Sequence, residues 1–479
     1  MKLTQSYHRL PEQLYHRCAP SPVSAPHFLA VNELLGEQLG LNHEWMLSSE
    51  GLDCFSCNAK STDYTSVATV YAGFQFGQYN PQLGDGRALL LGETINHNGQ
   101  VQEIQLKGAG PTPYSRGGDG RSALGPVIRE YLVSEAMHAL GVPTTRALMA
   151  LRTGDTVIRD RLQPGGILVR VAPSHLRFGS FQFAAARQDE EALNALMALA
   201  FARHYPQVAA ELQTSQHLLK LVTERTAQLV AKWMSIGFVH GVMNTDNMSI
   251  GGLTLDYGPC AFQDAFAWQQ VFSSIDTGGR YRYAQQPNIA LWNLARLAEA
   301  LLPIWPGTDD HKVAEAETIL RTFEPTFETH RNSLFAAKLG LRQDHSVYQS
   351  IIEPFLNVLE EHSLDFTLSF ALIEALSKDD HDRIHLVRSA LPQHASLERF
   401  WNEAAFEQGQ WQDDASNPLI IPRNHQIEAA IKSAEQGSDT EMSSLFRLYT
   451  SRPSLKDLSA EDLRGPEPGE WLGRTFCGT

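Results

Sequence analysis

The segment 237–258 constrains this chain more than any other stretch of its sequence. It reads G-F-V-H-G-V-M-N-T-D-N-M-S-I-G-G-L-T-L-D-Y-G, and a strongly amphipathic helix is predicted directly before it, over 215–236. The segment contains Asp246, Asn247 and Asp256, two carboxylates and one carboxamide. Such hard oxygen ligands suit Mg²⁺ or Mn²⁺ bridging polyphosphate oxygens better than they suit zinc.

The spacing of these residues can be compared with that of the protein kinase loop, in which an Asn stands seven residues after a His. His240 and Asn247 have this spacing. Kinases place their catalytic base two residues after the His, where this chain has Val242, and the nearest carboxylate is Asp246. Their second metal ligand is the Asp of Asp-Phe-Gly, and Asp256 begins an Asp-Tyr-Gly here. The spacing predicts a kinase-like metal site with altered chemistry, and the alternative is a plain turn rich in Asn and Asp.

The patterns along the chain predict two unlike halves. Gly-rich and short alternating segments fill the first half, whereas long helical patterns dominate from about residue 190. We expect an α+β protein with a sheet-containing N-terminal lobe, residues 1–180, followed by a mainly helical C-terminal lobe, residues 181–479. The second lobe contains the segment 237–258 and ends in a helical extension.

Individual elements follow from periodicity and from Gly and Pro positions. Strands are expected at 101–107, 156–158, 167–171 and 253–255, the last presenting Asp256. Besides 215–236, helices are expected at 122–140, 289–302, 313–323, 346–362 and 427–435.

Lys107 ends the strand predicted at 101–107. A lysine at a strand end grips nucleotide phosphates in kinase-like lobes, with an acid on the next helix as its partner. Glu130 is the best-placed acid on the helix 122–140, and Glu135 is its competitor. The alternative is a solvated lysine, which is the commoner state of this residue type.

Two Gly-rich segments accompany this lysine. Gly84 and Gly86 form a G-x-G that can bring backbone N–H groups close to a phosphate, although such a pair is more often a hairpin turn. The second segment, 116–121, leads directly into the predicted helix 122–140, which is anion-binding geometry. Asp119 in that segment is alternatively a cap of the helix.

Composition limits the classes of partner. The chain has 479 residues, 43% hydrophobic residues and a formal net charge of -15, which argues against nucleic-acid or anionic-membrane binding. No apolar run approaches the roughly 18 residues of a membrane span. The first residues lack the apolar core of a signal peptide, so a cytoplasmic location is expected.

Five cysteines are too few and odd in number for a disulfide framework.

Taken together, these segments resemble the SelO family of kinase-like protein adenylyltransferases, whose bacterial members are also called YdiU. The similarity runs through most of the chain. It includes L-G-D-G-R at 83–87, Q-L-K-G-A-G at 105–110, T-P-Y-S-R-G-G-D-G-R-S-A at 112–123, R-E-Y-L-V-S-E-A-M at 129–137, G-F-V-H-G-V-M-N-T-D-N-M at 237–248, L-D-Y-G-P at 255–259, G-R-Y at 279–281, Q-P-N-I-A-L-W-N-L at 286–294 and I-P-R-N-H at 421–425.

The resemblance implies a protein-kinase-like bilobal fold in which ATP lies flipped relative to kinases. AMP is then moved to Ser, Thr or Tyr hydroxyls of proteins, and the chain itself is one candidate acceptor. By position, Asp246 is the base, while Asn247 and Asp256 hold Mg²⁺ or Mn²⁺. Lys107 pairs with Glu130 and contacts phosphate.

The resemblance also assigns the rest of the nucleotide site. Residues implied to line it are Gly84, Gly86, Arg87, Asp119, Gly120 and Asp256. Arg170 and Arg177 are implied to bind the phosphate that the flip buries, and from their residue type alone they would be surface arginines. The flip accounts for two features that an ordinary kinase lacks, namely Val242 at the base position and this arginine pair.

SelO proteins can also carry a cysteine near the C-terminus and pair it with one in the segment after the Asp-Tyr-Gly. Cys477 matches the first position, and a thiol in a frayed tail is the alternative interpretation. The segment 261–279 contains no cysteine, with Phe272 and Ser273 in its second half. Cys260 is the one nearby partner.

Two other functions fit parts of the sequence. One is a conventional kinase-like phosphotransferase with ATP in the ordinary orientation, but Val242 stands where its base belongs. The other is an inactive pseudokinase scaffold that binds partners. Intact Lys107, Asn247 and Asp256 count against the scaffold, because a dead site has no chemical need for all three.

Overall fold

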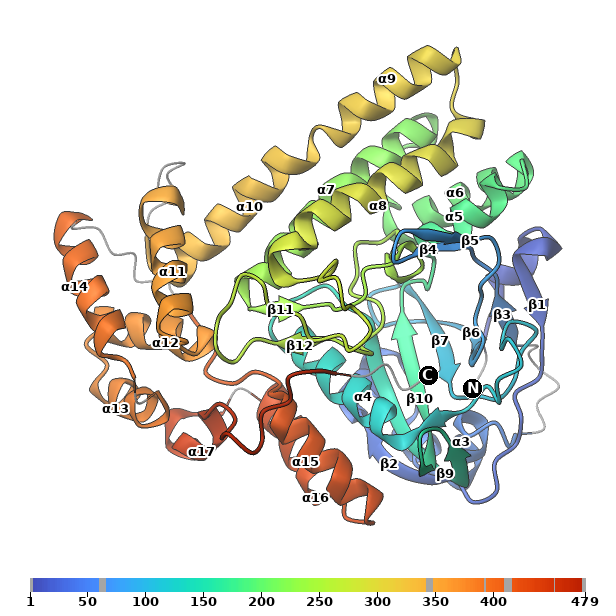
Figure 1. Cartoon of the computed structure of the whole chain (residues 1–479). Helices are drawn as coiled ribbons and strands as arrows, with labels where there is room; N and C mark the ends of the chain where they lie inside the picture. The colour runs from blue at the N-terminus through green and yellow to red at the C-terminus, as the bar shows by residue number, and fades with distance from the viewer. Residues whose placement is uncertain are drawn as a thin grey trace.

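The first part of the chain forms an antiparallel sheet. The computed structural model describes residues 3–59, 66–341, 348–391, 393–408, 416–451 and 453–475. Eight strands pair in the order β1-β3-β6-β7-β10-β9-β2, with β8 added to β10 (Figure 1). The strands are β1 (Tyr15–Arg17), β2 (His27–Val31), β3 (Val67–Thr69), β6 (Ala88–Ile95), β7 (Val101–Lys107), β8 (Ser122–Ala123), β9 (Arg146–Ile158) and β10 (Leu162–Ala172).

Helices cover both faces of this sheet, which explains why β9 and β10 contain continuous runs of buried residues. On one face Leu168 of β10 packs in a cluster with Ile128 of α4 (Leu124–Ala139). On the other face Val169 packs with residues of three short helices, α1 (Glu33–Gln38), α2 (His43–Met46) and α3 (Ser49–Phe55). Neighbouring residues of β10 therefore belong to two different cores, as expected for a strand buried on both sides.

The remainder of the described chain is mainly helical (Figure 1). Its helices are α5 (Phe178–Ala185), α6 (Glu190–His204), α7 (Ser215–Ser235), α8 (Gln286–Leu301), α9 (Asp309–Leu320), α10 (Phe323–Lys338), α11 (Glu353–Glu361), α12 (Phe366–Ser377), α13 (His381–Ala390), α14 (Ala395–Gln408), α15 (Asn424–Glu435), α16 (Thr440–Thr450) and α17 (Ala460–Leu463). The structure thus confirms an α+β protein with a sheet-rich N-terminal part and a helical C-terminal part. The division at residue 180 stays a prediction.

Helix α7 delivers the chain to the segment 237–258. The Thr214 hydroxyl accepts a hydrogen bond from the His217 N–H and caps the first turn. At the other end Gly237 has a φ of +70°, and a Cβ there would lie 2.9 Å from the Phe366 ring. Only glycine combines this backbone conformation with so close a neighbour, so the chain turns away at this residue, just after the C-cap Ile236.

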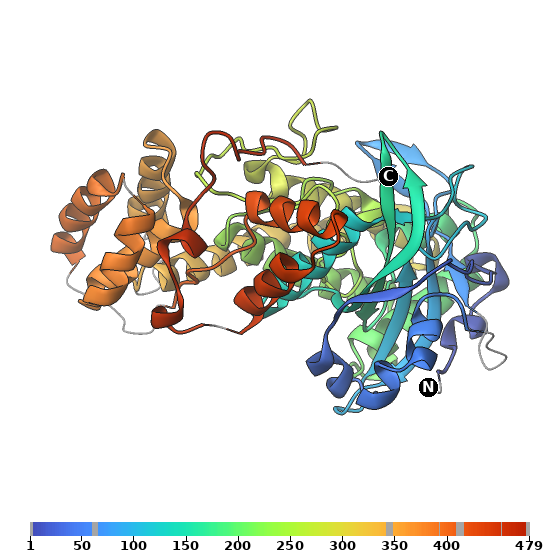
Figure 2. The same cartoon turned by 90° about the horizontal axis from the view of Figure 1, so that it is seen from below.

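The C-terminal helices return to the N-terminal part, and Figures 1 and 2 show α15 and α16 beside α4. Arg129 of α4 pairs with Glu428 at 2.7 Å and donates to the Asn424 side chain at 2.9 Å. The rings of Tyr131 and Phe446 lie in contact, tilted by 33°, with centroids 5.1 Å apart. Helices α15 and α16 of the C-terminal extension therefore pack against α4 and hold it by an ion pair, a hydrogen bond and a ring contact.

Several predicted boundaries were wrong. The helix predicted from residue 122 begins at Leu124, because 122–123 form the short strand β8 against β10. Residues 253–255 do not form a strand: Thr254 makes only isolated bridges, to Thr144 and to Met248. In the region predicted as one helix over 346–362, a π-helical turn at Tyr348–Ile352 precedes α11, and residues 342–347 lie outside the described part.

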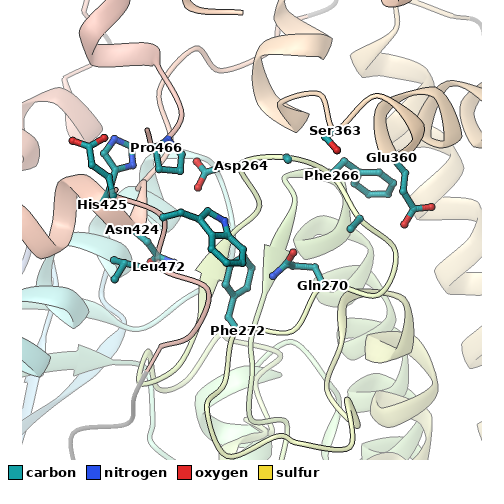
Figure 3. A pocket seen from close by; sticks show the side chains of 14 residues that line it. Asp264, Phe266, Gln270, Phe272, Glu360, Ser363, Asn424, His425, Pro466 and Leu472 are labelled. Carbon is teal, nitrogen blue, oxygen red and sulfur yellow. The ribbon is translucent and has the colours of Figure 1, made fainter. Parts of the chain in front are cut away.

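The last described residues run along the segment that follows β12 (Ala261–Phe262). The Thr475 N–H donates to the Phe272 carbonyl at 2.7 Å, and the Ser274 N–H donates to the Thr475 carbonyl at 3.0 Å. A cavity of about 170 Å³ opens beside this contact, with Phe272, His425 and Leu472 on its walls (Figure 3). Cys477 lies outside the described residues. None of the helices in the described part combines the length and apolar composition needed to cross a membrane.

Candidate active site

A cleft of about 660 Å³ lies where the sheet meets the helical part. Strands β7 and β10, both Gly-rich segments and the segment 237–258 all contribute to its walls. Every site residue predicted from the sequence lines it except Glu130, which stands behind Lys107. The lining residues among those predicted are Gly84, Gly86, Arg87, Lys107, Asp119, Gly120, Arg170, Arg177, Asp246, Asn247 and Asp256.

Lys107 joins the two parts of the molecule. It ends β7 opposite Leu168 of β10, on the face that α4 covers. Its Nζ lies 2.5 Å from Glu130 Oε2 and 3.2 Å from Asp256 Oδ1. Glu135, the competing partner, instead binds Arg146 at 2.7 Å. Lys107 is therefore a buried, paired lysine rather than a solvated one.

Asp256 is held as an ionised carboxylate in an unusual backbone conformation. Its φ is +76°, in the left-handed region that few residues other than glycine adopt, although Asp tolerates it. Burial opposes ionisation, yet the nearby cations, Lys107 first and Arg170 next, hold its pKa far below the ordinary range. The side chain therefore presents a negative charge to the cleft at any working pH.

A ring contact and a hydrogen bond to the backbone fix the segment from His240 to Asn247 in place. His240 is buried against Trp233, with ring centroids 5.3 Å apart, and burial lowers its pKa. The Val242 carbonyl accepts a hydrogen bond from Asn247 Nδ2 at 3.0 Å. Val242 thus contributes backbone rather than a base, and the Asn247 amide is oriented with its oxygen as the atom left for a ligand.

The oxygen atoms of Asn247 and Asp256 suit a divalent metal that takes further oxygen ligands from phosphate or water. Asn247 and Asp256 line the same cleft and offer carboxamide and carboxylate oxygens. Within the described residues, no group of three or more His, Cys, Asp and Glu side chains is placed to hold a metal by itself. Mg²⁺ is commonly held by one or two protein ligands plus phosphate oxygens and water, which suits what these residues provide.

Asp246 lies in a 3₁₀ turn, Thr245–Asn247, and is 7% exposed. Its Oδ2 accepts a hydrogen bond from Gln75 Nε2 at 3.2 Å, while Oδ1 has no hydrogen-bond partner in the described part of the protein. Burial raises the pKa of this carboxyl to about 6, against the opposing effects of Arg177 and Gln75. A carboxylate with a pKa near neutrality and one uncommitted oxygen has the properties of a general base.

The G-x-G packs on residues 112–115, which lead into the second Gly-rich segment. Gly84 has a φ of +140°, and a Cβ there would lie 2.5 Å from the Tyr114 ring. A Cβ on Gly86 would lie 2.8 Å from the Tyr114 carbonyl oxygen, and Thr112 donates to the Asp85 carbonyl at 2.6 Å. These glycines are therefore required by close backbone approach, and the two segments form one wall of the cleft.

The second Gly-rich segment does not lead directly into a helix N-terminus, as the sequence suggested. Strand β8 intervenes, the first residues of α4 are not among those that line the cleft, and Asp119 does not cap that helix. Asp119 instead pairs with Arg159 at 2.9 Å, and this hydrogen-bonded pair lowers its pKa. Asp119 and Gly120 still line the cleft, at its β9–β10 side.

Arg170 and Arg177 are both buried, contrary to the ordinary behaviour of arginine. Arg170 Nε donates to Glu130 Oε1 at 2.8 Å, which places its guanidinium beside Lys107. Arg177 Nη1 donates to the Asp246 carbonyl at 2.8 Å and its guanidinium lies 4.6 Å from the centre of the Tyr71 ring. With Lys107 they place three buried cations along one side of the cleft, which we call the buried cationic wall, and Arg177 also lies 3.8 Å from the Asp85 carboxylate.

Sequence patterns did not identify every residue of the cleft. Gln75, which binds Asp246, lies in a separate hairpin of β4 (Gly73–Gln75) and β5 (Gln78–Asn80). Gly77 between alternating aromatic residues is a hairpin signal, but nothing local indicates that the hairpin lies on Asp246. Asp85, inside the G-x-G, is buried and accepts a hydrogen bond from the Thr69 hydroxyl at 2.7 Å.

Comparison with known proteins gives a consistent result along nearly the whole chain. A family model described as protein adenylyltransferase SelO matches residues 1–451. The protein nucleotidyltransferase YdiU of Methylorubrum populi is 47% identical over 493 residues, covering 99% of this chain and 98% of the relative. Proteins of the same name from Rhodopseudomonas palustris strain BisB5 and from Anoxybacillus flavithermus are 45% and 43% identical, with the same coverage.

Proposed function

The chain belongs to the SelO family of protein adenylyltransferases, and we propose that it transfers AMP from ATP to Ser, Thr or Tyr hydroxyls of proteins. Family and relatives make it a protein nucleotidyltransferase; the nucleotide's orientation, the metal ligands and the residue roles are part of the proposal. The observation that carries it is the buried cationic wall of Lys107, Arg170 and Arg177.

This wall favours a flipped nucleotide. A single lysine is enough to grip phosphates in a kinase, whose terminal phosphate faces the acceptor. Here two buried guanidinium groups accompany Lys107 in the cleft. Bidentate arginines suit phosphate oxygens, so the β- and γ-phosphates would lie against this wall. The α-phosphorus would then face the side of the cleft that contains Asp246.

The arrangement is also what a kinase-like bilobal fold would provide. A strand-end lysine, its partner on the following helix and an Asp-Tyr-Gly carboxylate meet within 3.2 Å in this protein. Residues 1–180 would form the nucleotide-covering lobe and residues 181–479 the helical lobe with its extension.

The reaction follows from these positions. The acceptor oxygen attacks the α-phosphorus, a new P–O bond forms, and the bond to the bridging oxygen of pyrophosphate breaks. Asp246 accepts the proton from the acceptor hydroxyl. Asn247 and Asp256 would hold Mg²⁺ or Mn²⁺, which when bound neutralises phosphate charge. Lys107, Arg170 and Arg177 stabilise the negative charge of the departing pyrophosphate.

The test uses ATP labelled at the α-phosphate and, in parallel, at the γ-phosphate, with the purified protein, an acceptor protein and metal. Label on protein from the α position only, with a mass increase of one AMP, is the expected result. Label from the γ position only would identify a phosphotransferase and overturn the flipped orientation together with the roles of Arg170 and Arg177.

A further inference from the structure

Six side chains form a continuous surface at the Asp246 side of the cleft, which we name the aromatic–arginine surface. Two lie on the hairpin β4–β5, which packs beside α5 and α8 (Figure 1). The others come from the segment 280–281 and from α8. The six residues are Phe74, Phe76, Arg280, Tyr281, Trp292 and Arg296.

Ring and cation contacts hold this surface together. Phe74 meets Trp292 edge to face at 5.3 Å between ring centroids, and Phe76 meets Tyr281 at 5.1 Å. The Arg280 guanidinium lies 4.8 Å from the centre of a Trp292 ring. Tyr281 is buried and supports Phe76, which remains 36% exposed, whereas the other four side chains are half-buried. An ordered, partly open surface of aromatic and arginine side chains has the composition typical of protein interfaces.

The surface adjoins the proposed base through the hairpin. The Phe76 N–H donates to Asn244 Oδ1 at 3.1 Å, and Asn244 stands two residues before Asp246. The Tyr281 hydroxyl donates to the same oxygen at 2.6 Å. Phe76 also lines the cleft. A polypeptide lying on this surface would therefore have its next residues at the Asp246 end of the cleft.

The charge of the surface opposes that of the whole chain. The formal net charge is -15, yet Arg280 makes no ion pair with any described carboxylate, and its Nε has no hydrogen-bond partner there. Among the described residues, Arg296 pairs with the carboxylate of Glu299, whose side chain is 52% exposed. Cations that are ordered by aromatic rings and incompletely neutralised favour a partner that brings carboxylates.

We propose that the aromatic–arginine surface docks the acceptor protein through an acidic segment next to the modified hydroxyl. Carboxylates of that segment would pair with Arg280 and Arg296, and an apolar side chain would pack on Phe76. The inference rests on the proposed AMP transfer and adds the chemistry of its acceptor.

The test compares two synthetic peptides that share one tyrosine, one leucine and the same length. In the first the tyrosine is flanked by glutamates, and in the second by lysines. AMP transfer from α-labelled ATP to each peptide is measured with the unchanged protein and with the double variant Arg280→Glu/Arg296→Glu. The matched control is Arg321→Glu/Arg388→Glu, which makes the same charge change just after α9 and on α13, at side chains that are 75% and 41% exposed.

The unchanged protein and the control should label the acidic peptide about tenfold more efficiently than the basic one. The double variant should reverse this order, and a reversal cannot result from misfolding. Equal labelling of both peptides by the unchanged protein, or the same preference in the double variant, would overturn the docking surface alone. Absence of α-label on any peptide or protein would overturn the proposed function, and the docking role with it.

Discussion

The side-chain amide of Gln75 donates a hydrogen bond to the Asp246 carboxylate, with Nε2 and Oδ2 3.2 Å apart. Residues 171 positions apart in the sequence are thereby joined across the cleft. The contact is close along the whole hairpin strand, since a Cβ on Gly73 would lie 2.5 Å from Asp246 Oδ1. The hairpin β4–β5 therefore acts on the Asp246 carboxylate in two ways. It buries the carboxylate, which raises its pKa, and it donates a hydrogen bond, which lowers its pKa.

The Gln75→Met variant separates these two effects. Methionine keeps the side chain's length but cannot donate to Oδ2, so the pKa of Asp246 should rise further above about 6. Because a base acts when deprotonated, transfer should fall as pH falls through about 6 in the unchanged protein. In Gln75→Met the acidic limb of kcat/KM should move about half a unit to higher pH. A profile that stays in place would show that Gln75 does not act on the proton-accepting group.

Replacing Asp246 by Asn should stabilise the protein while abolishing transfer. Its pKa is raised from 3.8 to about 6, so the folded state binds more protons between these values and stability falls as pH rises through this window. Above pH 6 the buried charge costs up to about 3 kcal/mol. Asp246→Asn should therefore raise Tm at pH 8, and the difference should disappear near pH 4. An unchanged or lower Tm at pH 8 would contradict this account of the burial.

Asp256→Ala should abolish nucleotide transfer and leave the fold intact. The variant removes the carboxylate that Lys107 contacts at 3.2 Å and, by our proposal, a metal ligand. We expect transfer to fall at least about 100-fold, measured with α-labelled ATP. Asp310→Ala on the exposed first turn of α9 is the matched control and should keep full transfer. Full transfer by Asp256→Ala would show that the metal assignment is wrong.

Neutralising Glu130 should destabilise the protein. Its carboxylate lies between Lys107 and Arg170, and although burial opposes ionisation these cations lower its pKa. Glu130→Gln removes the carboxylate that Arg170 binds and leaves Lys107 with Asp256 as its remaining partner, which costs about 3–5 kcal/mol of unfolding free energy. Glu428→Gln removes a carboxylate that is 32% exposed and leaves Arg129 its hydrogen bond to Asn424, so it should cost about 1 kcal/mol or less. Equal losses in denaturant unfolding would contradict the distinction drawn between the two pairs.

Much of the site was predictable because its parts are local. The Lys107 strand was predicted to its last residue, since its short segment of interspersed apolar and polar residues is followed directly by the breakers Gly108 to Pro111. Helix α7 was predicted to within one residue, because its apolar stripe and terminal Gly237 are strong signals. The spacing from His240 to Asp256 indicated a metal site because these residues also lie within one short segment.

Tertiary structure decided which of these residues meet. Periodicity left Glu130 and Glu135 as competitors, and the packing of α4 on β9 and β10 placed the first at Lys107 and the second at Arg146. Asp256 was expected at the end of a strand, but two isolated bridges of Thr254 and a left-handed φ hold it instead.

The hairpin β4–β5 and helix α15 make contacts between residues far apart in the sequence. Such contacts cannot be predicted from the periodicity of a local segment. Gln75 approaches Asp246, and Arg129 approaches Glu428, only once separate layers of the protein have packed. The sequence by itself determined which side chains are available for the chemistry, because residue types and local backbone preferences are carried by neighbouring residues. Only the tertiary structure decided their partners and burial, and burial raises the pKa of Asp246 while the charges of Lys107 and Arg170 lower that of Asp256.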